Sequence, residues 1–135
     1  MRLSRPTTAF LIAPLATVPV LALGGALVNL AGGEEFNVVL PGVLQASFFF
    51  ALFGLPIAYL ATALIGRPLY RALLVRNMLS WRTVMAVGTA IGALLMPVVW
   101  LSFFGPMMVR EAVLMATIGA LMGLASSMVF AAIAL

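Results

Sequence analysis

The stretch "FNVVLPGVLQASFFFALFGLPIAYLATALIG", residues 36–66, contains no charged residue and is longer than a helix needs to cross a membrane. A hydrocarbon core about 30 Å thick requires about 20 apolar residues at roughly 1.5 Å of rise each. Period-two alternation, the mark of a lipid-facing β-barrel strand, is missing from it. Three further uncharged runs flank this one, at 6–33, 83–109 and 112–135. The chain is therefore predicted to be all-α, with membrane spans at about 8–30, 43–65, 83–104 and 112–133.

The composition places the whole chain in the membrane class. Of its 135 residues, 65% are hydrophobic and 7% charged, and the mean hydropathy is +1.27. Soluble domains are roughly 45–50% apolar and about 25% charged. The segments between the apolar runs are too short to bury a core of their own. We expect residues 1–135 to form one transmembrane helical bundle with short loops.

The arginines predict how the bundle is oriented. Arg2 and Arg5 precede the first run, and four more lie between the second and third runs, in a predicted loop at 67–82. With four spans these six share one side, whereas Arg110 and all three glutamates fall on the other. The positive-inside rule then places both termini in the cytoplasm.

The loop at 67–82 is predicted to anchor the chain to anionic lipid headgroups. Arg67 before Pro68 favours an end of the second span near Gly66, followed by a short amphipathic helix in the headgroup region. Docking of a cytoplasmic partner is the second interpretation of the loop, and nucleic acid is not expected as a partner, because the arginines border apolar spans. The predicted topology and lipid anchors are Arg67, Arg71, Arg76, Trp81 and Arg82.

The first span also has some features of a secretory signal. Two arginines precede an apolar stretch, and Gly24 and Ala26 could serve as small residues at a cleavage site. The uncharged run is much longer than the 7–15 residues of a signal core, and Pro14 and Pro19 interrupt it. We therefore expect a retained anchor, with cleavage after Ala26 as the alternative.

Small residues recur every four positions in the last two spans, at Gly88 and Gly92 and at Gly119 and Gly123. Small side chains let helix backbones approach closely, which matters in lipid because association there depends on van der Waals contact. The pattern predicts close helix packing. It fits closure of the bundle within one chain, and it equally fits a homo-oligomer or a larger membrane complex.

Prolines predict possible kinks inside three spans, at Pro14, Pro19, Pro56 and Pro97. Each lacks the amide proton that would bond the carbonyl four residues earlier. Kinked helices can line a cavity, here with hydroxyls from Thr17, Ser47, Thr62, Thr89 and Ser102. The alternative is that these prolines are ordinary features of spanning helices.

The missing residue types exclude much chemistry. Cysteine, histidine, lysine and aspartate are all absent, so the sequence predicts no catalytic residue, no metal site, no cofactor and no enzymatic activity. The three acids, Glu34, Glu35 and Glu111, lie at the ends of the spans. A proton-coupled carrier needs a titratable group inside the membrane, which disfavours that mechanism.

The segment "YLATALIGRPLYRALL", residues 59–74, followed by "LSWR" at 79–82 and a glycine-rich span, resembles a pattern common in small uncharacterised four-helix inner-membrane proteins of bacteria. The resemblance covers the middle third of the chain. It implies a location and a fold, and it carries over neither an activity nor a functional residue.

Two functions fit these features. The first is a non-enzymatic multi-pass membrane protein that acts through helix–helix contacts, as an accessory subunit, assembly factor or scaffold. The second is an oligomeric passive pore, channel or facilitator, including the hole-forming type, with the kinked helices lining its path.

Overall fold

The structure is a computed structural model that describes residues 5–135, apart from the side chain of Val28; Arg2 lies outside this range. The described chain folds into helices and short connections, without strands. Four continuous helical segments are long and apolar enough to cross a membrane: Arg5–Ala31, Phe36–Val75, Trp81–Phe104 and Val109–Ala134. The expected all-α class with four candidate spans is confirmed.

The first span consists of α1 (Arg5–Ile12), the 3-10 segment η1 (Ala13–Ala16) and α2 (Thr17–Ala31). Pro14 lies inside the 3-10 segment, which bonds each amide to the carbonyl three residues back. The helix thus departs from α geometry at Pro14, where a possible kink is predicted. The Thr17 hydroxyl donates a hydrogen bond to the Pro14 carbonyl at 2.6 Å, which satisfies an acceptor inside the buried turn.

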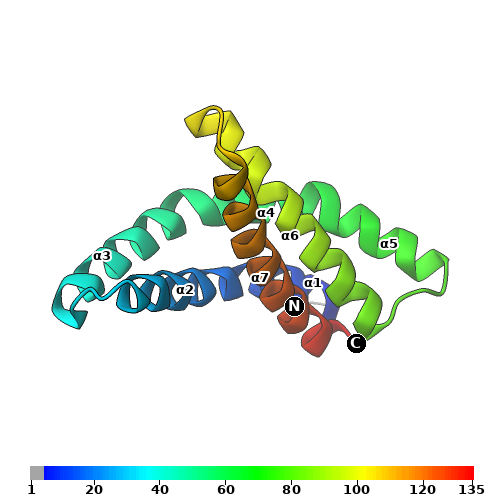
Figure 1. Cartoon of the computed structure of the whole chain (residues 1–135). Helices are drawn as coiled ribbons and strands as arrows, with labels where there is room; N and C mark the ends of the chain where they lie inside the picture. The colour runs from blue at the N-terminus through cyan, green and yellow to red at the C-terminus, as the bar shows by residue number, and fades with distance from the viewer. Residues whose placement is uncertain (1–4) are drawn as a thin grey trace.

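The second span is longer than predicted and runs without interruption from Phe36 to Val75 (Figure 1). Its parts are α3 (Phe36–Phe49), the π-helical turn η2 (Phe50–Gly54), α4 (Leu55–Ala61), the π-helical turn η3 (Thr62–Gly66) and α5 (Arg67–Val75). We refer to Phe36–Val75 as the long helix. Arg67 has helical backbone angles, φ −64° and ψ −50°, so the span does not end at Gly66 and the predicted loop at 67–82 shrinks to residues 76–80.

The two π turns account for the continuity of the long helix at two of its three prolines, whereas Pro41 lies inside the regular α-helix α3. Each turn ends at a glycine, and a proline follows two residues later, at Pro56 and at Pro68. A proline in a regular α-helix clashes with the carbonyl four residues back and leaves it without a donor. Local π geometry rearranges these bonds, which lets a membrane helix continue past the proline. The residues that predicted an end of the second span are therefore accommodated within it.

The long helix ends in a compact turn that leads directly into α6 (Trp81–Phe104). Asn77 adopts φ +53°, and the Met78 and Asn77 amides donate to the carbonyls of Leu73 at 3.0 Å and Leu74 at 3.1 Å. These two hydrogen bonds form a pattern that commonly ends a helix. The pattern requires a residue with left-handed backbone angles, which asparagine tolerates. The Ser80 hydroxyl then accepts a bond from the Thr83 amide at 3.2 Å and caps α6.

The third and fourth spans, α6 and α7 (Val109–Ala134), form an antiparallel hairpin with the most extensive contact in the molecule (Figure 1). Gly105, with φ +87°, ends α6. The Glu111 carboxylate accepts a hydrogen bond from the Met108 amide at 3.0 Å and caps α7. Regular helix continues through Pro97, so no break in α6 accompanies this proline.

The densest packing lies at one end of the bundle, where α1, the start of α6 and the end of α7 meet. Three rings gather there: Phe10 lies 4.7 Å from Phe130 between centroids, and Tyr70 of α5 contacts both of them edge-on at 5.7 Å. Arg5 and Arg82 lie at this same end of their helices, so we call it the arginine end. The fully or nearly buried hydrophobic cluster consists of Ala9, Ala13, Val84, Phe130 and Ala131.

Candidate functional site

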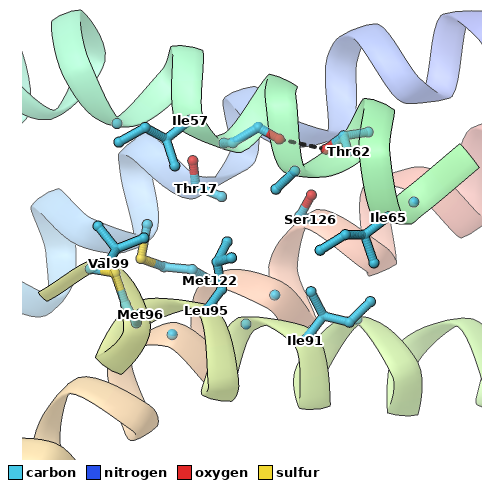
Figure 2. A pocket seen from close by; sticks show the side chains of 18 of the residues that line it. Thr17, Ile57, Thr62, Ile65, Ile91, Leu95, Met96, Val99, Met122 and Ser126 are labelled. Carbon is cyan, nitrogen blue, oxygen red and sulfur yellow. Dashed lines mark hydrogen bonds between the residues drawn. The ribbon is translucent and has the colours of Figure 1, made fainter. Parts of the chain in front are cut away.

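A cleft of about 1220 Å³ separates the long helix from the α6–α7 hairpin. Figure 2 shows Ile57, Thr62 and Ile65 of the long helix facing Ile91, Leu95 and Val99 of α6 across it. Side chains from all four spans line the cleft, and nearly all of the lining is apolar. Thr17 of α2 and Met122 of α7 also line it.

The long helix presents residues to the cleft at strict four-residue intervals. One row runs through Ala46, Phe50, Gly54, Ala58, Thr62, Gly66 and Tyr70, and a second row runs beside it through Phe49, Phe53, Ile57, Ala61, Ile65, Leu69 and Leu73. Most of the first row is small. These small residues leave open space along the helix, and no other helix of the chain fills it.

The opposite face of the long helix repeats at the same interval with large apolar side chains. Leu44, Phe48, Leu52, Leu60 and Leu64 are each between 55 and 67% exposed, and Pro56 continues the row. We call these five large side chains the outer stripe. A helix of 3.6 residues per turn cannot keep a four-residue row on one face, because every step over-rotates by about 40°.

The two π turns remove this drift. From Leu44 to Leu64 the five steps would rotate the row by about 200° in a regular helix. Each π turn accommodates about one residue more than an α turn, which offsets about 100°. Since η2 lies within this stretch and η3 begins within it and ends at Gly66, the outer stripe and the first cleft row stay on opposite sides of the long helix.

A hydrogen bond ties the middle of the long helix to the first span. The Tyr59 hydroxyl donates to the Leu11 carbonyl at 2.6 Å. Leu11 lies two residues before the 3-10 segment, where the shift from four-residue to three-residue bonding leaves carbonyls of the preceding turn available. The proline-containing turn at Pro14 thus creates the acceptor that positions the second span.

The hydroxyls that could line a polar path bond to their own helices instead. In the four bonded cases the donor is a threonine or serine and the acceptor a carbonyl three or four residues earlier, at 2.6–2.8 Å: Thr17 to Pro14, Thr62 to Ala58, Thr89 to Met85 and Ser102 to Val98. The Ser47 hydroxyl is buried and has no partner in the described structure. Thr17 and Thr62 do reach the cleft, but they add little polarity to it.

The predicted anchor residues lie around the arginine end. Arg67 and Arg71 project from α5, Arg76 lies in the connecting turn, and Trp81 and Arg82 begin α6; all five are exposed. The Arg67 guanidinium carbon lies 5.9 Å from the centroid of the Phe10 ring, within the range of a cation–π contact. Glu34, Glu35 and Glu111 lie at the opposite ends of the helices.

The predicted packing glycines meet one another inside the hairpin. A methyl group on Gly92 would overlap the Gly119 carbonyl oxygen, and one on Gly123 would overlap the Gly88 carbonyl oxygen. Ser127 continues the row against Gly88. The structure therefore brings α6 and α7 into backbone contact, and this leaves the cleft as the unfilled space of the bundle.

Sequence reasoning missed the cleft rows and the outer stripe of the long helix. The signal was available as small residues at Gly54, Ala58, Thr62 and Gly66, four apart, alternating with large residues two positions away. A second signal was the repeated glycine–X–proline at 54–56 and 66–68, which follows each π turn.

No known family model, curated protein or solved structure matches this chain.

Proposed function

We propose that this chain is a multi-pass protein of the bacterial inner membrane, with both termini in the cytoplasm, that acts through helix–helix contacts as an accessory subunit, assembly factor or scaffold. The observation that carries the proposal is the outer stripe, which two π turns hold on one face of the long helix. The contact partner proposed for this face is a transmembrane helix of a larger membrane protein.

Contact with lipid alone does not require such a face. Acyl chains are fluid and apolar on all sides, so the leucines of a helix that contacts only lipid can lie on any of its faces. Packing against another helix does depend on register, because association in a membrane comes from close van der Waals fit. Interruptions of α-helical geometry by π turns are frequent at functional sites, which is consistent with a selected face.

The distribution of charge supports the remaining parts of the proposal. Arg67, Arg71, Arg76 and Arg82 lie near the connection between the long helix and α6, whereas the three glutamates lie near the other two connections together with Arg110, the asymmetry expected of a cytoplasmic arginine end. The described spans carry no carboxylate near their middle that would favour ion-coupled transport.

A passive pore is the second candidate, because the cleft is large and proline-containing segments border it. Its apolar lining and internally bonded hydroxyls would give ions and water few partners. Selective channels are lined by carbonyls, charged rings or polar groups. The cleft therefore favours the contact function over the pore.

The contact function is tested by gentle purification of the tagged protein from its native membrane. We expect a stoichiometric membrane partner that is lost when Leu52 and Leu60 of the outer stripe are both replaced by alanine. The matched control replaces Leu94 and Leu101, which are also exposed but lie on α6. This control is expected to retain the partner.

A lone chain that carries no partner, together with ion or solute flux from liposomes containing the purified protein, would overturn the contact function and support the pore. Equal loss of the partner in both double variants would show that the outer stripe is not the docking face.

A further inference from the structure

We propose that the cleft is a binding site for one anionic phospholipid, with the acyl chains between the long helix and the hairpin and the phosphate at Arg67. The outer stripe lies on the opposite face of the long helix, so this site is independent of the proposed partner contact.

The cleft has the size and shape for an acyl chain. Its volume of about 1220 Å³ exceeds the roughly 300–1,000 Å³ typical of pockets for small molecules. On the long helix, Gly54, Ala58 and Gly66 leave the space open instead of filling it. On the far side, the small residues of α6 and α7 already contact each other. They therefore do not bring the long helix into close contact with the hairpin, and the cleft stays open.

Water is a poor occupant of this space. A buried water needs two to four polar partners. The hydroxyls of Thr17, Thr62 and Ser127 already bond to carbonyls of their own helices, Ser126 adds one further hydroxyl, and most of the lining is apolar. In a bilayer the surrounding medium is hydrocarbon, so lipid acyl chains are the apolar molecules available to fill the cleft.

The charge at the arginine end selects an anionic headgroup. Gly66 and Phe10 both line the cleft; Arg67 follows Gly66 in the chain and lies over the Phe10 ring at 5.9 Å. Arg71 is one helical turn farther along, and the glutamates are at the other end of the bundle. Guanidinium groups bind phosphate oxygens through paired, charge-assisted hydrogen bonds. A phosphate at this end would meet positive charge close to where the acyl chains enter.

A second copy of the chain is disfavoured as the occupant by the same charges. A parallel second copy inserted in the cleft would bring its own arginines to this end, where like charges repel. An anionic lipid instead brings the complementary charge together with the chains.

The size of the cleft is tested with Ala58→Phe, which places a ring in the lining. The protein is reconstituted in vesicles of equal phosphatidylglycerol and phosphatidylcholine, extracted gently, and weighed with its bound lipid by native mass spectrometry. We expect the unmodified chain to retain phosphatidylglycerol and the variant to retain about tenfold less, equivalent to about 1.4 kcal/mol. Ala58→Leu is a milder second variant, expected to show an intermediate loss.

The control for this variant is Ala63→Phe, because Ala63 lies on the same stretch of helix, is exposed and does not line the cleft. It is expected to bind lipid as the unmodified chain does. Equal retention by Ala58→Phe and Ala63→Phe would overturn the site. A lipid-free dimer as the main species of the unmodified chain would overturn it as well, in favour of a second copy in the cleft.

The headgroup is tested with Arg67→Gln, compared with Arg110→Gln at the opposite end. We expect Arg67→Gln to lower the preference for phosphatidylglycerol over phosphatidylcholine about fivefold, equivalent to the roughly 1 kcal/mol of one arginine near an anionic surface. Arg110→Gln should leave the preference unchanged. An unchanged preference in Arg67→Gln, or no preference in the unmodified chain, would overturn the anionic headgroup.

Discussion

Gly92 shows how little space separates the two helices of the hairpin. A β-carbon there would overlap the Gly119 carbonyl oxygen and lie 3.0 Å from the Gly123 Cα. Both neighbours are backbone, which cannot move without shifting α7. We expect Gly92→Ala to lower the free energy of unfolding by about 1–3 kcal/mol, the usual cost of overpacking. Reversible unfolding in mixed detergent micelles measures this change.

The matched control is Gly24→Ala in α2, where an added β-carbon meets nothing within 4 Å. It should be neutral or slightly stabilising, because alanine is the better helix former. Equal destabilisation by both variants would mean that glycine flexibility, and not helix contact, explains the result.

The sequence located these glycines but could not choose their partners. A four-residue row of small residues predicts close approach equally well within one chain and between two. The structure adds the pairing of Gly92 with Gly119 and of Gly88 with Gly123. Tyr59 is a comparable case: its depth in the span indicates a need for an acceptor, but the Leu11 carbonyl becomes available only through the 3-10 turn around Pro14.

At the scale of the element, η3 sets the rotation of everything that follows it in the long helix. Inserting one alanine after Ala63 exceeds the one extra residue that this π turn accommodates and is expected to rotate α5 by about 100° relative to α4. Tyr70 would then leave its edge contacts with Phe10 and Phe130. We expect a loss of about 1–3 kcal/mol for these two aromatic pairs, measured by the same unfolding method.

The control for the insertion is Ala63→Leu, which keeps the number of residues and places the larger side chain on an exposed position. It should unfold like the unmodified chain. An insertion variant as stable as this control would show that the number of residues in the π turn does not set the position of Tyr70.

The π turns were beyond the sequence-based prediction because their markers are ambiguous. Glycine two residues before proline is also a common way to end a helix, and Gly66-Arg67-Pro68 favours that interpretation on local grounds. The continuous helix depends on the contacts of Arg67 and Tyr70 with Phe10 of another span. A single sequence does not display such distant contacts.

At the scale of the molecule, the number of spans was predictable and their arrangement was not. Charge-free runs longer than the bilayer is thick give the four helices directly. Their packing depends on fit, because lipid is as apolar as the side chains and provides no hydrophobic drive between helices. The open cleft between the long helix and the hairpin is therefore a property of the structure that composition and hydropathy cannot show.

The arginines of the 67–82 stretch are predicted to determine the orientation of the molecule in the membrane. Three of them lie in helices, and only Arg76 lies in the connecting turn. Replacing Arg67, Arg71, Arg76 and Arg82 with glutamate should produce a mixture of orientations, since positive charge near the ends of spans retains a segment in the cytoplasm. The chain has no cysteine, so Asn77→Cys in the turn supplies a unique thiol. An impermeant maleimide applied to spheroplasts should leave this thiol unlabelled in the unmodified background and label a substantial part of it in the glutamate variant.

The same four positions changed to lysine keep the charge and should keep the thiol protected. A glutamate variant whose thiol stays as protected as in the lysine variant would mean that packing within the bundle, and not these charges, sets the orientation.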